Sequence, residues 1–153
     1  MKAQRYVKPS AIDRAFNGLI QLLTGLGVSI YGSRVLAVRG RKSGEWRTVP
    51  VNLLVHEGTR YLVAPRGETE WVRNMRAAGG GELRLGRACD PFGAVELTDA
   101  EKPPILRLYI EKWWFEVGRF FEGVTRDASP DDLRRIAPGF PVFRLTSGAA
   151  GRP

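Results

Sequence analysis

Hydrophobic residues recur along this chain in two patterns, one helical and one typical of strands. From Ile12 onwards they return every three to four residues, which predicts an amphipathic helix. Ser10 and Asp13 have the spacing of a capping box before it, and Gly25 and Gly27 are expected to end it. The helix is expected either to pack its apolar face on a sheet or to lie on a lipid surface.

Short runs of β-forming residues follow. They predict strands over 34–39, 46–56, 60–64, 82–88, 92–97 and 141–145. A turn at Glu57 and Gly58 joins two of them into a hairpin, and the glycines at 79–81 are expected to end a helix over 70–78. Because open sheet edges are a liability, this many antiparallel strands predict a small β-barrel with helices packed around it.

Three further helices are predicted, over 70–78, 105–121 and 130–137. Thr69 and Ser129 are the expected N-caps of the first and last, and the middle one is rich in aromatic residues. The chain is therefore expected to be a single α+β domain over 1–153. We expect an amphipathic helix within 1–33, a barrel core over 34–98, helices and a closing strand over 99–145, and a tail over 146–153.

The amino-acid composition limits the kinds of binding partner that the protein is expected to have. The 153 residues hold 24 Lys and Arg against 16 Asp and Glu, so a net charge of +8 predicts an anionic partner. Cys89 and His56, the only cysteine and histidine, cannot supply the usual ligands of a metal site, and no disulfide can form within the chain. With no signal-peptide pattern and no bilayer-length apolar stretch, the sequence favours a cytoplasmic protein.

Positive charge gathers in the segment RGRKSGEWRTVPV at 39–51, where two predicted strands meet. Cations crowded at one hairpin repel each other unless an anionic group lies among them. The loop APRG at 64–67 and the start of the helix at 70–78 are expected nearby, and a helix N-terminus also favours anions. Trp71 and Asn74 share one face of that helix. Together these features predict a groove for an elongated ligand with an anionic group and an aromatic ring.

The motifs GRKSG-x-x-R-x-x-P, VA-x-x-G and W-x-x-N occur here in this order. In that order and spacing the sequence resembles the deazaflavin-dependent nitroreductase family, actinobacterial oxidoreductases that use coenzyme F-420. The resemblance covers about 35–97. It implies a split β-barrel like that of FMN-binding proteins, and hydride transfer from the reduced deazaflavin.

By the same resemblance, the cofactor site is expected to comprise Arg41, Lys42, Ser43, Arg47, Thr48, Pro50, Ala64, Pro65, Arg66, Gly67, Trp71 and Asn74. Arg41, Lys42 and Arg47 would hold the phosphate and the acidic tail. The loop at 64–67 would line the ring edge through its backbone, and Trp71 with Asn74 would close the pocket.

The acceptor side departs from the family pattern. Asn52 stands where family members carry a tyrosine, and the aromatic helix offers Tyr109, Trp113 and Trp114 instead. These four residues are the expected substrate pocket, and Tyr109 is the candidate proton donor. Core packing is the alternative role for the aromatic residues. The expected acceptor is apolar and electron-poor: a quinone, an enone or an unsaturated lipid.

Alternatives remain open. The same barrel could bind FMN, or could bind the deazaflavin without turning over a substrate. A basic nucleic-acid-binding barrel also fits the charge, although the aromatic residues gather in predicted helices rather than on an exposed strand face. Residues 1–27, with Lys2, Arg5 and Lys8 beside the amphipathic helix, could contact the inner face of a membrane.

Overall fold

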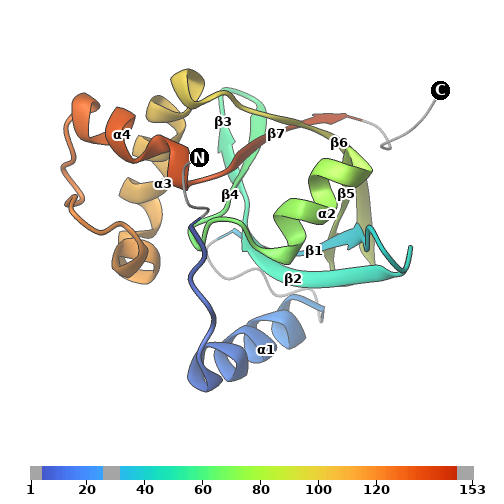
Figure 1. The fold of residues 1–153 in the computed structure, drawn as a ribbon. Helices are drawn as coiled ribbons and strands as arrows, with labels where there is room; N and C mark the ends of the chain where they lie inside the picture. The colour runs from blue at the N-terminus through green and yellow to red at the C-terminus, as the bar shows by residue number, and fades with distance from the viewer. Residues whose placement is uncertain (1–4, 26–31, 148–153) are drawn as a thin grey trace.

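The computed structural model describes residues 5–25 and 32–147 of the chain. At its centre these residues form an antiparallel sheet with the strand order β2-β1-β5-β6-β7-β4-β3 (Figure 1). Its strands are β1 (Ser33–Arg39), β2 (Trp46–Asn52), β3 (Leu54–His56), β4 (Thr59–Val63), β5 (Gly80–Leu85), β6 (Ala88–Glu96) and β7 (Val142–Ser147). The predicted α+β class and curled antiparallel sheet are confirmed.

The helices surround this sheet. They are α1 (Ala11–Gly25), α2 (Glu70–Ala78), α3 (Lys102–Val117) and α4 (Pro130–Ile136), with 3-10 turns η1 (Asp99–Glu101), η2 (Gly118–Phe120) and η3 (Ala137–Gly139). In Figure 1, α2 lies across the sheet, α3 and α4 pack together on one side, and α1 lies below β2. No helix in the described ranges is long and apolar enough to cross a bilayer.

The sheet curls because β2 and β3 are neighbours in sequence but lie at its opposite edges. Asn52 still pairs with Ser33 of β1, whereas Leu54 already pairs with Tyr61 of β4. One residue spans only about 3.5 Å, so the two edges must approach each other at Leu53. The single strand predicted over 46–56 is therefore wrong: the chain changes edges in its middle, which closes the sheet into a half-barrel.

Local signals placed several element ends correctly. The predicted capping box of α1 is confirmed by two bonds between Ser10 and Asp13: the Ser10 N–H donates to Oδ2 at 3.0 Å, and the Asp13 N–H donates to Oγ at 3.1 Å. Ser129 caps α4 in the same way. The turn at Glu57 and Gly58 is also confirmed, with φ of 50° and 77°. The expected end of α1 at Gly27 lies outside the described residues.

The β5–β6 hairpin differs from the prediction in its turn and start. The turn begins at Gly86, so the predicted strand over 82–88 overran it, and β6 starts earlier than the predicted 92. The glycines at 79–81 end α2 as predicted, with Gly79 as its left-handed C-cap, and Gly81 already lies inside β5. A Cβ there would come within 2.4 Å of the Ala37 carbonyl oxygen, so this glycine permits close strand approach. Likewise β7 continues to Ser147 instead of ending at 145, because Ser147 pairs with Phe92.

The aromatic helix predicted over 105–121 is shorter and bent. α3 starts at Lys102 and ends at Val117, with non-helical angles at Trp113 (φ −121°, ψ 20°). Gly118 then begins the 3-10 turn η2. A Cβ on Gly118 would lie 2.9 Å from the Trp114 ring, so the missing side chain lets this ring pack against the backbone. The change of helix type ends the regular pattern that the sequence suggested.

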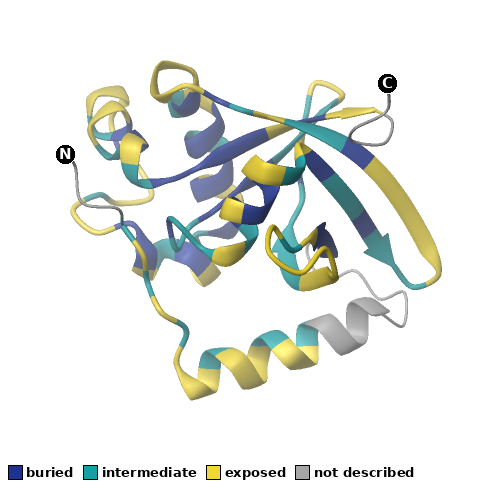
Figure 2. Ribbon diagram, turned by 45° about the vertical axis from the view of Figure 1, so that its right-hand side comes forward, coloured by how far each residue is buried: buried dark blue, intermediate teal, exposed yellow. Residues whose placement is uncertain are grey.

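Two hydrophobic clusters form the core. The first fills the space between the sheet and α2, and includes Leu36, Leu62, Met75, Phe92 and Phe143. The second joins α3 and α4 to the other part of the sheet, and includes Leu106, Ile110, Trp113, Phe121 and Val142. Figure 2 shows this burial on the strands and on the inner faces of the packed helices, while the described part of α1 is mostly exposed.

Candidate functional site

A cavity of about 610 Å³ opens between the β1–β2 hairpin, the start of α2, the end of α3 and α1. The predicted cofactor residues that line it are Arg41, Lys42, Ser43, Arg47, Thr48, Pro50, Ala64, Pro65, Arg66, Trp71 and Asn74. Gly67 is the exception. It is buried beside the chain's N-terminal segment, and a Cβ there would lie 2.1 Å from the Arg5 carbonyl oxygen.

The β1–β2 turn presents the cations of the hairpin to this cavity. The Gly40 N–H donates to the Glu45 carbonyl at 2.8 Å, and the Gly44 N–H donates to the Gly40 carbonyl at 2.8 Å. Gly44 has φ of 73°, which favours glycine. At Gly40 a Cβ would lie 2.9 Å from the Ser43 hydroxyl oxygen. Both glycines therefore keep the loop tight enough to hold its charged side chains at the cavity mouth.

Arg41 is held by α2. Its backbone N–H and its guanidinium Nη1 donate to the same Asn74 oxygen, Oδ1, at 3.1 and 2.9 Å. Nη1 also lies 2.8 Å from the Glu70 carboxylate. Asn74 is only 5% exposed, so its carbonyl oxygen is a buried acceptor satisfied by Arg41. Asn74 was expected to contact the ligand; in the structure it fixes the Arg41 guanidinium on the cavity wall.

Thr69 precedes α2 with extended N-cap angles, but its side chain makes no capping bond. Its Oγ1 is the buried side-chain atom without a hydrogen-bond partner in the described part of the chain, and Thr69 lines the cavity. Leaving a buried hydroxyl unpaired costs about 1–3 kcal/mol. A ligand oxygen beside the N-terminus of α2 would relieve this cost and meet the positive end of the helix dipole.

β2 lines the cavity from Arg47 to Asn52. Six strand residues span about 17 Å, so the hairpin cations and Asn52 lie far apart along it. Near Asn52 the wall contains Tyr109 and Glu116 of α3. The Asn52 amide donates to Glu116 Oε2 at 3.2 Å and also hydrogen-bonds the Tyr109 phenol. The cavity thus has a cationic part and a second polar part, with Val49 and Val51 on the strand between them.

Tyr109 is 2% exposed. Burial raises the pKa of its phenol well above the ordinary value, and the nearby Glu116 carboxylate raises it further, so the phenol stays neutral. The two tryptophans predicted for the same pocket do not line it. Trp113 is fully buried and packs on Tyr109 with ring centroids 5.1 Å apart, and Trp114 packs against the same core cluster.

The loop at 64–66 also anchors the N-terminal segment. The Arg5 guanidinium donates to the Pro65 carbonyl at 2.7 Å, and the Val7 N–H donates to the Arg66 carbonyl at 2.9 Å. Arg5 therefore points into the fold and does not belong to a membrane-facing cationic patch. Lys2 lies outside the described residues. The carbonyl groups of Ala64, Pro65 and Arg66 thus already accept hydrogen bonds from the protein, so the loop shapes the wall mainly by its position.

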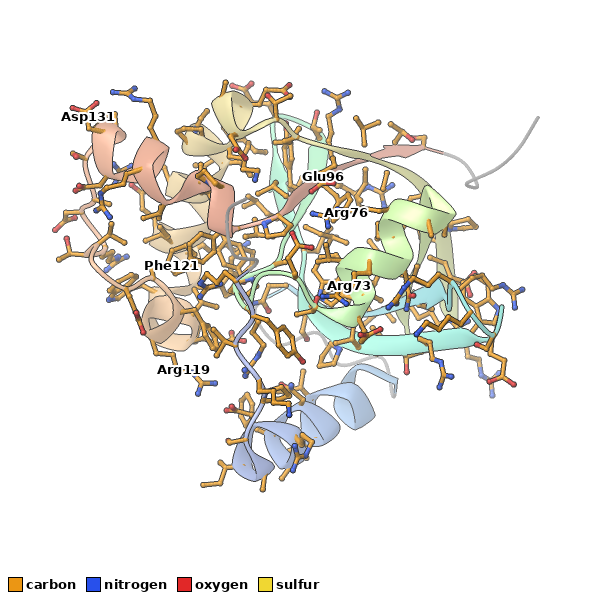
Figure 3. The ribbon with its side chains drawn as sticks, in the orientation of Figure 1. Arg73, Arg76, Glu96, Arg119, Phe121 and Asp131 are labelled. Atoms are coloured by element: carbon orange, nitrogen blue, oxygen red, sulfur yellow. The ribbon has the colours of Figure 1, made fainter. Side chains whose placement is uncertain are left out.

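α1 forms one wall of the cavity, with Phe16, Asn17 and Ile20 lining it. Asp13 attaches the helix: its carboxylate lies 3.1 Å from Arg66 Nη2 and 2.7 Å from Arg119 Nη2. Arg119, labelled in Figure 3, comes from η2. The Arg119 hydrogen bond, followed by that from the Ser10 backbone and the one from Arg66, holds the pKa of Asp13 far below its usual range.

Several of these roles were absent from the sequence prediction. Glu70 was expected only as the first residue of a helix, and Asp13 only as a capping residue. Glu116 and Thr69 carried no site assignment. The ion pair between Glu70 and Arg41 could not be read from local sequence, because the two residues are 29 positions apart in the chain.

The curled antiparallel sheet with α2 across it defines the protein as an α+β split β-barrel. Three solved structures share the fold. An F420-H2 dependent reductase (FDR-A) is 21% identical, over 78% of this chain and 99% of that one, with a TM-score of 0.52. A domain-swapped dimer is 21% identical, over 88% of this chain and 96% of that one, with a TM-score of 0.53. An FAD-binding protein from Mesorhizobium loti is 14% identical, over 92% of this chain and 91% of that one, with a TM-score of 0.51.

Residues 12–123 match the family described as F420H(2)-dependent quinone reductase. Since the match covers more than half of the chain, the protein belongs to this family. The predicted likeness to deazaflavin-dependent oxidoreductases is therefore confirmed, and with it the prediction of an enzyme whose coenzyme is F-420. No curated protein matches the chain.

Replacing Asp13 with Asn should loosen α1 from the cavity at neutral pH, because a neutral amide cannot balance two guanidinium groups. In the native protein the lowered carboxyl pKa means that this attachment is complete above about pH 4, the ordinary aspartate range, and is lost only as pH falls through the lower folded value. Amide hydrogen exchange of residues 10–20 measures the effect at pH 7, and we expect faster exchange in the variant.

Asp131→Asn is the matched control for that variant, since Asp131 pairs with the exposed Arg134 on α4, away from the cavity. Equal exchange of residues 10–20 in native protein and Asp13→Asn would show that the charge pairs do not hold α1.

Proposed function

We propose that this protein holds reduced coenzyme F-420 in the cavity beside the β1–β2 hairpin and reduces an apolar, electron-poor acceptor there. Quinones, enones and unsaturated lipids have this chemistry. The observation that carries the proposal is the wall of one cavity, which combines the fixed cation Arg41, the apolar strand surface of β2 and the neutral phenol of Tyr109. Family membership supplies the coenzyme and the quinone-type reaction.

The cationic part of the cavity suits the phosphate and acidic tail of the coenzyme. Arg41, Lys42 and Arg47 would bind these groups by charge-assisted hydrogen bonds. The unpaired Thr69 hydroxyl and the N-terminus of α2 add neutral donors at the same wall. The residues present therefore fit an elongated anionic cofactor, and the unsatisfied hydroxyl is the structural sign of a missing polar partner.

The ring of the coenzyme needs a flat, mostly apolar surface. Trp71 is half-buried, lines the cavity, and packs on Phe143 with ring centroids 5.8 Å apart, so its indole is held in place. Ala64 and Pro65 continue this wall, and Pro50 of β2 also lines the cavity. We assign Ser43 and Thr48 as hydroxyl contacts on the hairpin side. Gly67 we assign to anchoring the N-terminal segment, because it lies outside the cavity wall.

When bound, the reduced deazaflavin supplies a hydride, so the protein must orient the acceptor, exclude water and provide a proton. A quinone that accepts a hydride also needs one proton to become a hydroquinone. We assign Tyr109 to donate this proton to the acceptor oxygen, because its buried neutral phenol lines the cavity. Its raised pKa means that the phenolate so formed regains a proton from solvent, which completes the cycle. Asn52 hydrogen-bonds the phenol, and its amide is in turn held by Glu116, which positions the hydroxyl.

The exposed side of α1 supports an apolar acceptor and contact with lipid. Ile12, Phe16 and Leu19 are 81%, 52% and 52% exposed, and Phe16 also lines the cavity. An apolar helix surface continuous with the cavity wall would let a lipid-soluble acceptor enter from a membrane surface. We therefore propose a peripheral membrane contact through α1, with the helix lying in the plane of the interface.

Replacing both Arg41 and Lys42 with Ala should weaken binding of coenzyme F-420 by about 100-fold or more, because two charge-assisted contacts to the anionic part are lost. Quenching of tryptophan fluorescence measures this, with FMN titrated in parallel; we expect the native protein to prefer the deazaflavin. A double variant of the exposed Arg87 and Arg134 to Ala removes the same charge elsewhere. Unchanged affinity in the Arg41 and Lys42 variant would refute this placement.

Tyr109→Phe should lower kcat by about 100-fold while leaving KM nearly unchanged, because the ring remains and only the proton is lost. The native rate should show no decline between pH 8 and the ordinary tyrosine range of about 10, since burial keeps the phenol protonated there. Steady-state kinetics with a soluble quinone measures both. A variant with full kcat would assign Tyr109 to core packing alone.

Replacing Ile12 and Leu19 with Ser should weaken partitioning onto liposomes, measured by co-sedimentation, by about 100-fold or more, because each exposed side chain contributes about 1.5–3 kcal/mol when it enters lipid. Phe16 and Ile20 stay in place to keep the cavity wall. The matched control replaces the exposed Val55 and Val95, which lie on strands away from α1. Equal sedimentation of native protein and the α1 variant would rule out lipid contact through this helix.

A further inference from the structure

Glu70 is a carboxylate placed among the cations of the cavity. We propose that Glu70 is the internal counter-anion of Arg41 and that it makes the site discriminate between ligands by the charge of their phosphate. A singly charged phosphodiester would be accepted, and a doubly charged phosphomonoester would be disfavoured. This inference rests on the proposed placement of the coenzyme at the hairpin, and it concerns the residue that determines specificity there.

The geometry places the carboxylate where a ligand anion would bind. Glu70 Oε2 lies 2.8 Å from Nη1 of Arg41, on the rim of the same cavity. Lys42 and Arg73 also act on this carboxylate electrostatically, so Glu70 lies within the positive field that attracts the ligand. An incoming phosphate must therefore displace Glu70 from Arg41 or bind next to it.

Glu70 stays ionised in this position. The hydrogen bond from Arg41, together with the nearby Arg73 and Lys42, lowers the pKa of its carboxyl below the ordinary value. It is also the first residue of α2, where the helix dipole favours a negative charge. The site consequently carries a permanent negative charge at neutral pH.

Displacing Glu70 is easy, whereas displacing Arg41 is not. The Glu70 side chain is 72% exposed, and exposed ion pairs are weak. Arg41 keeps two further bonds to the buried Asn74 oxygen, through its backbone and through Nη1. The guanidinium therefore remains on the cavity wall when Glu70 moves aside, but the Glu70 charge stays nearby and repels the ligand anion.

This repulsion depends on ligand charge. A phosphomonoester carries about −1.5 to −2 at pH 7, whereas a diester carries one charge. Two unit charges 4 Å apart interact by about 1 kcal/mol even in water, so a doubly charged phosphate suffers about twice the repulsion of a singly charged one. The phosphate of coenzyme F-420 is a diester, and that of FMN is a monoester. With the phosphate at Arg41 and the acidic tail extending towards Arg47, Glu70 would therefore contribute to the choice of coenzyme through the charge of the phosphate.

Glu70→Gln tests this inference, because the amide keeps the shape and removes the charge. Titrations followed by tryptophan fluorescence should show FMN binding tightened by about fivefold to twentyfold and F-420 binding by about twofold to fivefold. The difference should shrink in high salt as the charges are screened. The control is Glu45→Gln, which removes a charge 4.0 Å from Arg47 and off the cavity wall. It should change both affinities by less than about twofold.

Binding of both coenzymes by Glu70→Gln that is equal to or weaker than binding by the native protein would overturn the inference, as would a gain for FMN that is no larger than the gain for F-420. A thermal unfolding curve of each variant confirms that it is folded. If the native protein does not bind F-420, the proposed function fails. The inference then stands or falls on a monoester and a diester probe, phenyl phosphate and diphenyl phosphate: a larger gain for the monoester supports it, and an equal gain refutes it.

Discussion

One buried amide oxygen determines where the Arg41 cation of this site lies. Asn74 Oδ1 accepts hydrogen bonds from both the backbone and the guanidinium of Arg41, and so joins the β1–β2 turn to α2. α2 is itself held in the core by Val72 and Met75. The guanidinium is therefore positioned by the folded core, and a ligand does not have to order it on binding. Such preorganisation lowers the entropic cost of recognition.

The opposite wall of the cavity is held in another way. α1 is attached through the Asp13 carboxylate and two arginines, while its described side chains make little contact with the core. Ion pairs near the surface are weaker than buried packing, so α1 is expected to open at a lower free energy than the sheet. A rigid cationic side and a more easily opened apolar side suit an enzyme that keeps its coenzyme and exchanges its acceptor.

The sequence predicted those parts of the structure that local signals determine. Ser10 and Ser129 mark helix starts by their own hydrogen bonds, and glycines mark the turns after Arg39 and at Glu57. The division of 46–56 into two strands was not predictable in this way. The residues on both sides of Leu53 form strands equally well, and only the closure of the sheet makes the chain change edges there. The early start of β5 at Gly80 was missed for a similar reason, because the close contact of Gly81 with Ala37 arises from strand pairing.

The candidate site shows the same limit. The motif residues gather around the cavity as predicted because they lie on elements that local sequence defines. The sequence could not show which aromatic side chains of α3 line the cavity and which pack in the core, because Tyr109 and Trp113 are one turn apart on the same helix face. Only the bend at Trp113 and the packing of the core show that the phenol reaches the cavity and the indole does not. Pairs such as Arg41 with Glu70 depend on folding and leave no local trace.

The contact at Gly67 ties α1 to a position outside the cavity wall. The Arg5 carbonyl fills the space that a β-carbon at residue 67 would occupy, and the chain runs from Arg5 directly into α1. Any larger residue at 67 would push this N-terminal segment outwards and carry the start of the helix with it. One absent methyl group thus affects the α1 wall of the cavity, although Gly67 itself does not line that cavity.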